Sequence, residues 1–203
     1  MKNKPIISWM LNIVLLLAVL LVLLVNTGTK ETDMKEFAEL PEGPAPELIS
    51  QDPITYQLPD PRLQSDFSVE QAMAQRRSHR SYVKSAISTA ELSQVLWAAY
   101  GITKADRSRA GFRGGFRTAP SAGATYPLEV YAVVGKVKGL EPGIYRYVPD
   151  GHQLVLAQEG DHREPLAGAA LNQEMIADAP ASLFFSAVFE RTMQRYGERG
   201  RLR

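Results

Sequence analysis

The sequence RTAPSAGATYPLEVYAVV runs from Arg117 to Val134 and joins a turn of small residues to an apolar stretch. The apolar half, Leu128–Val134, is rich in β-branched and aromatic residues, which predicts a strand buried on at least one face. The first half carries little side-chain bulk, so its backbone amides could approach a flat ligand closely. A tight loop with a short helix packed on the sheet would explain the glycine and the prolines, but not the full string.

Helices and strands are predicted on both sides of this stretch. Ser68 and Ser88 each begin a capping-box pattern and so predict the start of a helix, and Gly101 suits the C-terminal cap of the second helix. The turn Pro149-Asp150-Gly151 predicts a hairpin of strands 144–148 and 153–157, and a further strand is expected at 181–188. Helices are expected at 161–171, 174–177 and 190–196. This alternation lacks regular βαβ units, which favours an α+β fold.

The apolar pattern of the second helix predicts which of its faces is buried. Leu92, Val95, Leu96 and Ala99 follow one another at i, i+3, i+4 and i+7. We expect these four side chains to pack on the core.

The N-terminal region has the features of a membrane anchor. Residues 5–25 carry no charge, and at about 1.5 Å rise per residue they would span roughly 31 Å as a helix. We expect residues 1–26 to be a single-pass anchor with a short cytoplasmic N-terminus; a cleaved signal peptide is the alternative. The lysines on the two sides of the stretch offset one another, and the positive charge of the amino terminus favours a domain on the extracytoplasmic side. Residues 27–63 are polar and proline-rich, which predicts a linker before a folded domain at 64–203.

The composition excludes several classes of site. The chain has no cysteine, so disulfides, zinc-thiolate sites and thiol nucleophiles are ruled out. His79, His152 and His162 are not spaced as metal ligands, and no metal is expected. The net charge of +1 gives no basic excess for nucleic acid. The loop RSRAGFRGGFR at 107–117 is therefore interpreted as a flexible loop near an anionic ligand or as a disordered connection.

A basic cluster follows the first soluble helix and is a candidate for phosphate binding. Arg76, Arg77, Ser78 and Arg80 fall within five residues. Guanidinium groups bind phosphate oxygens in bidentate fashion, and a serine hydroxyl adds a further donor. A solvated basic helix end that complements the helix dipole is the alternative.

Four segments, taken in order, resemble the nitroreductase superfamily and most closely its SagB/ThcOx-type dehydrogenase branch. They are RRSHRSY at 76–82, RTAPSAGATYPLEVYAVV at 117–134, GIYRYVPDGHQLV at 143–155 and RYGERG at 195–200. The resemblance runs from about Phe67 to Gly200. It implies an α+β sandwich that binds FMN at a homodimer interface. It also implies hydride transfer through the flavin N5 to or from a small-molecule or peptide substrate.

The resemblance also implies roles for individual residues. The segment that contacts the flavin phosphate and ribityl chain matches Arg76, Arg77, Ser78 and Arg80. The loop that reaches the flavin, often that of the partner subunit, matches Pro120, Ser121, Ala122 and Gly123. The catalytic lysine-tyrosine pair of azoline-oxidising members reads Arg195-Tyr196 here. Tyr196 could transfer a proton, whereas arginine cannot release one as lysine does, so azoline oxidation is not favoured.

The family pattern continues beyond Gly200 into further dimer and flavin contacts, so we expect a domain that is incomplete at its C-terminus. The alternative to a flavin oxidoreductase is a non-catalytic, membrane-anchored remnant or interaction domain of the same fold.

Overall fold

The computed structural model describes residues 53–108 and 113–202. The predicted membrane anchor lies outside these residues. Within them, no helix is both long and apolar enough to cross a membrane. Residues Pro165–Gln173 cluster separately from the unit that carries the sheet and hold most of helix α4 (Arg163–Ala169). The account below concerns the unit formed by Pro53–Glu164 and Glu174–Arg203.

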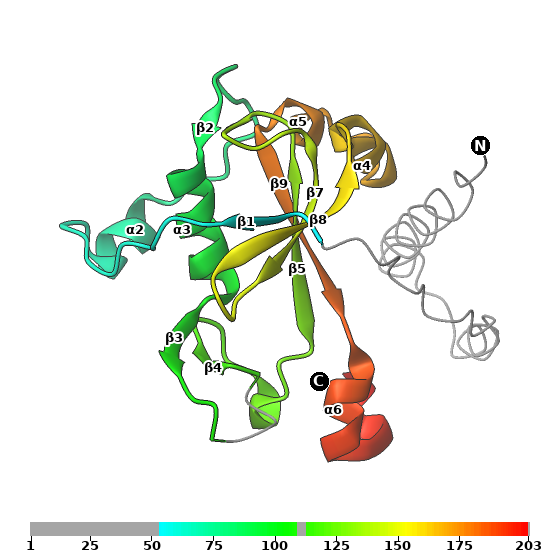
Figure 1. Cartoon of the computed structure of the whole chain (residues 1–203). Coiled ribbons are helices and arrows are strands. Elements are labelled where there is room, and N and C mark those ends of the chain that lie inside the picture. Colours follow the sequence, from blue (N-terminus) through cyan, green and yellow to red (C-terminus); the bar gives the residue numbers. More distant parts are fainter. Residues whose placement is uncertain (1–52, 109–112, 203) are drawn as a thin grey trace, which may run out of the picture. The chain divides into compact units, whose positions relative to one another are not determined.

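A five-stranded antiparallel sheet forms the centre of this unit (Figure 1). Its spatial order is β1 (Thr55–Gln57), β8 (Gln153–Glu159), β7 (Gly143–Val148), β5 (Leu128–Val134) and β9 (Ala181–Ala187). The strand β5 lies between β7 and β9 and pairs with both over most of its length. The predicted strand at Leu128–Val134 and the predicted hairpin of β7 and β8 are thereby confirmed.

Helices and two small strand pairs surround the sheet, which confirms the α+β class. The helices are α2 (Val69–Gln75), α3 (Thr89–Tyr100), α5 (Glu174–Asp178) and α6 (Phe189–Tyr196), with 3-10 turns η3 (Ala122–Ala124) and η4 (Gly197–Leu202). Strand β2 (Ile87–Ser88) pairs in parallel with β6 (Val137–Lys138), and β3 (Ile102–Ala105) pairs antiparallel with β4 (Gly115–Arg117).

Both predicted capping boxes are present. The Ser88 hydroxyl accepts the backbone N–H of Glu91 at 3.2 Å, and the Glu91 carboxylate accepts the backbone N–H of Ser88 at 2.7 Å. The same reciprocal pair joins Ser68 and Gln71 at the start of α2. Each box satisfies two backbone donors that would otherwise lack a partner at the helix start.

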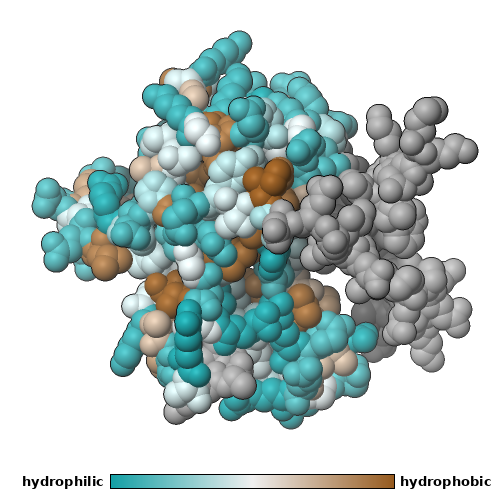
Figure 2. Space-filling view, viewed as in Figure 1, coloured by the Kyte–Doolittle hydropathy of each residue, from teal (hydrophilic) through white to brown (hydrophobic). Residues whose placement is uncertain are grey.

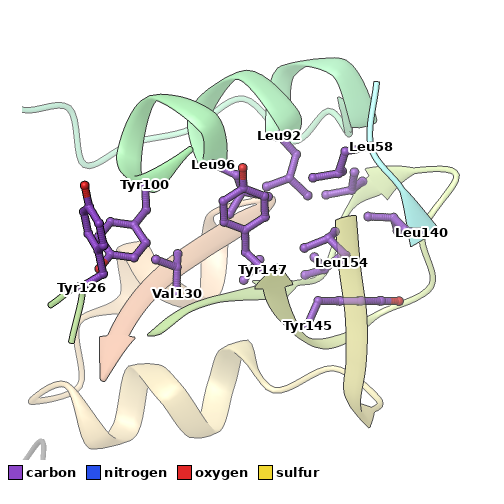
Figure 3. Packing of buried hydrophobic residues seen from close by; sticks show 13 residues of the cluster. Leu58, Leu92, Leu96, Tyr100, Tyr126, Val130, Leu140, Tyr145, Tyr147 and Leu154 are labelled. Carbon is purple, nitrogen blue, oxygen red and sulfur yellow. The ribbon is translucent and has the colours of Figure 1, made fainter. Parts of the chain in front are cut away.

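The helix α3 covers one face of the sheet and supplies much of the core (Figure 3). The predicted apolar face of α3 is partly wrong. Leu92 and Leu96 are buried as expected, but Val95 is 53% exposed, and Ser93 and Tyr100 are buried in its place. Ser93 is tolerated there because its hydroxyl donates to the Pro59 carbonyl.

The C-terminal cap of α3 is Gly101, as predicted. The need for glycine at this position is steric and does not come from the backbone conformation. Its φ of −71° is open to any residue. A Cβ at this position would lie 2.2 Å from Cδ1 of Trp97. Close approach of the indole ring therefore requires glycine here.

The expected linker boundary at residue 64 is too late. Thr55–Gln57 pairs with β8 as an edge strand, and Leu58 is only 3% exposed within the core. The carbonyl of Pro59 also accepts hydrogen bonds from the buried network of Ser93 and His152. The domain thus includes part of the proline-rich stretch, because alternate residues of that stretch are apolar enough to join the sheet.

Candidate functional site

The small-residue turn that precedes β5 is held by its own polar side chains. The Ser121 hydroxyl accepts the backbone N–H of Tyr126 at 2.9 Å, and the Thr125 hydroxyl donates to the Ala122 carbonyl at 3.0 Å. Gly123 adopts φ +60°, a left-handed conformation that favours glycine. Pro120 and Ala122 are exposed, so small residues present the backbone of this turn to solvent.

The end of α6 lies against this turn. Nη1 of Arg195 donates to the Gly123 carbonyl at 3.0 Å, and the buried Thr192 hydroxyl lies 3.4 Å from that of Thr125. A Cβ on Gly123 would lie 2.5 Å from Cδ of Arg195 and 2.5 Å from the hydroxyl of Tyr196. The structure therefore brings both predicted catalytic residues to the predicted flavin loop, although Gly123 lies 72 positions before Arg195 in the sequence.

Arg117, the first residue of the motif, is enclosed by two aromatic rings. Its guanidinium carbon lies 4.5 Å from the ring centre of Tyr100 and 4.9 Å from that of Tyr126. Nη1 donates to the Tyr100 carbonyl and Nη2 to the Arg113 carbonyl. Burial lowers the pKa of this guanidinium and raises the pKa of the Tyr100 hydroxyl. Arg117 thus joins α3 to the start of the turn and is a cation partly withdrawn from water.

A second arginine on α6 fastens the helix to β5. Arg191 donates to the carbonyl of Tyr126 at 3.1 Å and pairs closely with the carboxylate of Glu129, and both side chains are 18% exposed. Arg146 on β7 lies 3.7 Å from the other oxygen of Glu129. Because Arg191 and Arg195 are one helical turn apart, both reach the same loop from one face of α6.

A pocket of about 370 Å³ lies beside these contacts. Its lining includes Tyr100, Arg117, Glu129, Arg146 and Arg191. It also includes the ends of β5 and β7 but none of the eight residues predicted to bind the flavin. Within the described residues, no group of three or more carboxylate or histidine side chains could hold a metal ion.

The predicted phosphate cluster lies on a different part of the molecule. The segment with α2 projects from the body at the left of Figure 1, away from the turn and α6. Arg76, Arg77, Ser78 and Arg80 are all exposed. Arg76 donates to the Ser78 hydroxyl at 3.4 Å, and Arg77 donates to the carbonyls of Ala74 and Arg76. Within one chain, the structure does not bring the basic cluster and the small-residue turn together.

The projecting segment is apolar as well as basic. Its helix α2 has no buried residue, and Phe67, Val69 and Met73 are 49%, 71% and 75% exposed. The apolar side chains of α2 therefore face solvent in the single chain. Figure 2 shows hydrophobic surface among the hydrophilic residues of this projection.

The two separate surfaces suit the two ends of FMN. The turn offers an open backbone with little side-chain bulk, which fits a flat ring, and the basic cluster offers guanidinium and hydroxyl donors, which fit a phosphate.

The sequence did not reveal Tyr100, Glu129 or Arg146 as neighbours of the turn. They come from α3, β5 and β7, and only the sheet pairing brings them together. Arg191 lies four residues before Arg195 on the same helix, so the sequence spacing already places the two on one face.

Comparison with known proteins gives consistent matches. A family model described as the nitroreductase family matches residues 73–203. A protein of Methanocaldococcus jannaschii that is named as a nitroreductase is 43% identical over 149 residues, which cover 73% of this chain and 70% of that protein.

Two crystal structures of proteins that are also named as nitroreductases match the fold. The one from Ralstonia eutropha JMP134 has a TM-score of 0.57 at 27% identity and covers 80% of this chain and 72% of its own. The one from Anabaena variabilis has a TM-score of 0.50 at 33% identity and covers 56% of this chain. The matched part is 23% of that longer protein.

Proposed function

The chain belongs to the nitroreductase family, and from that premise we propose that it is an FMN-dependent oxidoreductase. Its α+β fold is shared with a family relative of known structure. When bound, FMN would accept a hydride at N5 and pass it on in a second half-reaction. The residues of this chain would bind the cofactor, orient it and supply protons.

The observation that carries the proposal is the position of Arg195 and Tyr196 against Gly123. Arg195 holds the Gly123 carbonyl at 3.0 Å, which orients the turn on which the flavin ring would rest. The hydroxyl of Tyr196 comes so close that a single methyl group on Gly123 would displace it. A phenol held there could donate a proton from its Oη to a substrate beside the ring.

We propose that two copies of the chain complete each flavin site. The exposed apolar side chains of α2 need a covering surface, and the basic cluster that follows α2 lies apart from the turn of its own chain. In a homodimer, the cluster of one chain and the turn of its partner could hold the same FMN. The exposed apolar projection supports this arrangement.

The finer assignment is to the SagB/ThcOx-type dehydrogenase branch, with a small-molecule or peptide substrate. It is supported by the string APSAGATYP at 119–127 and by RYGERG at 195–200. Because an arginine side chain does not release a proton as lysine does, we propose that Tyr196 alone moves a proton at this site. Arg195 would then position the turn.

We also propose that residues 5–25 anchor the protein in a membrane as a single pass, with the domain on the extracytoplasmic side. The uncharged apolar stretch in the sequence supports this. Protease added to intact cells should digest the domain, and alkaline carbonate should leave the chain in the membrane pellet. Release by carbonate, or full protection of the domain, would contradict this part of the proposal.

The decisive experiment is a titration of the full chain with FMN, followed by flavin absorbance and fluorescence. The matched variants are Gly123→Ala and Gly197→Ala. The two glycines have nearly equal φ, +60° and +59°, but a Cβ on Gly197 would meet nothing within 4 Å. The ψ angles differ, +19° at Gly123 and −152° at Gly197, so an alanine is at least as strained at position 197 as at position 123. Only Gly123→Ala also displaces Arg195 and Tyr196.

We expect FMN binding by the unmodified chain and by Gly197→Ala, and binding at least about tenfold weaker in Gly123→Ala. Folded protein that remains colourless and ignores added FMN would overturn the proposal. It would instead favour the non-catalytic membrane-anchored remnant or interaction domain. Equal FMN affinity in both variants would show that the turn does not hold the cofactor.

A further inference from the structure

A pocket with excess positive charge lies between the β3–β4 hairpin, the ends of β5 and β7, and α6. Its volume is about 370 Å³, which is at the small end of the range for ligand sites. Four guanidinium groups and two carboxylates line it: Arg113, Arg117, Arg146, Arg191, Glu129 and Asp150. The lining therefore carries two positive charges more than negative ones.

Both carboxylates already have cationic partners. Glu129 pairs with Arg191 and lies 3.7 Å from Arg146. Asp150 pairs at 2.8 Å with Arg107, which lies outside the lining. Among the described residues, no carboxylate forms an ion pair with Arg113 or Arg117. With Arg107 counted, five guanidinium groups face two carboxylates, and Arg113 and Arg117 carry two of the three unbalanced positive charges.

The pocket also borders buried polar atoms that lack acceptors. Within the described part of the chain, Nε of Arg117 and the hydroxyl of Tyr100 are buried and make no hydrogen bond of normal length and angle. Tyr100 as a whole is only 3% exposed. Buried polar groups without a partner are rare, because they have lost their water and gained nothing in return. An oxyanion in the pocket would neutralise the charge of the enclosed Arg117 guanidinium, which has no carboxylate partner among the described residues.

The rest of the lining is apolar. Leu128, Val130, Val148 and Pro149 contribute aliphatic surface beside the arginines. A ligand that matches both parts has an anionic head and a short hydrocarbon body. Inorganic ions would match the head alone.

We propose that this pocket binds a small organic acid through its carboxylate or phosphate group, with the hydrocarbon body against Leu128 and Pro149. The site goes beyond the proposed flavin chemistry. All its lining residues come from one chain, and none belongs to the basic cluster, the small-residue turn or the pair Arg195 and Tyr196.

The test uses three probes that share one hydrocarbon body: butyrate, monobutyl phosphate and butyramide. Binding to the full chain is measured by isothermal titration calorimetry in one detergent buffer. We expect saturable binding of butyrate, of monobutyl phosphate or of both, and none of butyramide. The two acids show whether the head group is a carboxylate or a phosphate.

Three variants locate the site. Arg117→Gln removes the enclosed guanidinium, and Arg146→Gln removes a side chain that is 44% exposed, so that its loss disturbs packing less. Each should weaken binding of the acids at least about tenfold, since each removes a charge-assisted donor. Arg62→Gln is the matched control. Arg62 is exposed and lies outside this pocket. The Arg62→Gln variant should therefore bind the acids with the affinity of the unmodified chain.

Three results would overturn the inference: binding of butyramide as tight as that of butyrate, no binding of either acid, or unchanged affinity in both pocket variants. Displacement of the acids by FMN would also overturn it, because the pocket would then belong to the flavin site. None of these measurements requires bound flavin. A failure of the proposed oxidoreductase function therefore leaves this test intact.

Discussion

Nη1 of Arg195 donates a hydrogen bond to the carbonyl oxygen of Gly123 at 3.0 Å, and this contact joins the last turn of α6 to the loop before β5. It places the neighbouring hydroxyl of Tyr196 next to the same glycine. The loop and the two side chains form one structural unit. A change in the loop should therefore move the two side chains, and a change in either side chain should move the loop.

Replacing Tyr196 by phenylalanine should slow turnover while FMN binding is retained. The variant loses the proposed proton donor but keeps the ring, and loss of a general acid slows reactions by about 10² to 10⁴-fold. The measurement is the oxidation by menadione of pre-reduced, FMN-loaded protein. Tyr131→Phe is the control, because Tyr131 stacks on Phe184 at 4.8 Å and is not part of the turn. An unchanged rate in Tyr196→Phe would exclude the proton-transfer role.

Replacing Arg191 by glutamine should destabilise the domain. Its partner Glu129 would be left mostly buried, and the remaining ion pair among the described residues would be the longer one with Arg146 at 3.7 Å. Removal of one partner from such a pair is expected to lower the free energy of unfolding by about 1 to 3 kcal/mol. Urea denaturation measures this. The exposed pair of Arg201 and Glu198 supplies the control, and Arg201→Gln should have little effect.

Replacing Leu96 by alanine should lower the free energy of unfolding by about 2 to 5 kcal/mol. Leu96 is fully buried between α3 and the sheet. The control is Val95→Ala on the next residue, which is 53% exposed and should change stability by less than about 0.5 kcal/mol. Similar losses in both variants would contradict the observed orientation of α3.

The stability of the domain should fall as the solution is acidified below about pH 6.5, the ordinary pKa of histidine. Burial lowers the pKa of His152, which accepts from the Tyr147 hydroxyl at Nδ1 (2.8 Å) and contacts Ser93 through Nε2 (2.6 Å). Burial also raises the pKa of Tyr147 to about 12, so its hydroxyl keeps its proton. The unfolded chain then binds a proton more readily than the folded one. Stability is complete above the unfolded pKa and is lost as the pH falls towards the folded pKa.

The measurement is the Tm of the full chain between pH 8 and pH 5. In His152→Asn the Tm should fall less between pH 8 and pH 5 than in the unmodified chain. Asparagine is chosen because residue 152 has φ +49°, which asparagine tolerates. His79 is exposed, and the Tm of His79→Asn should fall over this pH range as much as that of the unmodified chain. An identical decline in all three proteins would exclude His152 as its source.

Much of the fold could be predicted because its signals are local. The two capping boxes, the strand at Leu128–Val134 and the Pro149-Asp150-Gly151 turn depend on neighbours within a few residues. The short strands β1, β3 and β4 could not be predicted in the same way. Each has three or four residues, and pairing with a distant segment defines it.

The candidate site, like the fold, could be predicted only in part. The turn at 120–123 and the pair Arg195 and Tyr196 were found from sequence, and the fold places them together. The pocket was missed because Arg117, Glu129 and Arg146 come from separate strands and become neighbours only in the sheet. The buried face of α3 was predicted only in part, because nothing in the sequence indicated a buried serine. Pro59 and His152, the hydrogen-bond partners of Ser93, lie far away in the sequence.

The exposure of helix α2 has a consequence for its stability. Seven residues are too few for a helix to persist in water without support, so a surface that covers α2 would also stabilise the arginines that follow it. If that surface is a second copy, subunit association and FMN binding are linked equilibria. Dilution would then weaken the apparent affinity for FMN, and saturating FMN would hold the pair together at concentrations at which the apoprotein dissociates.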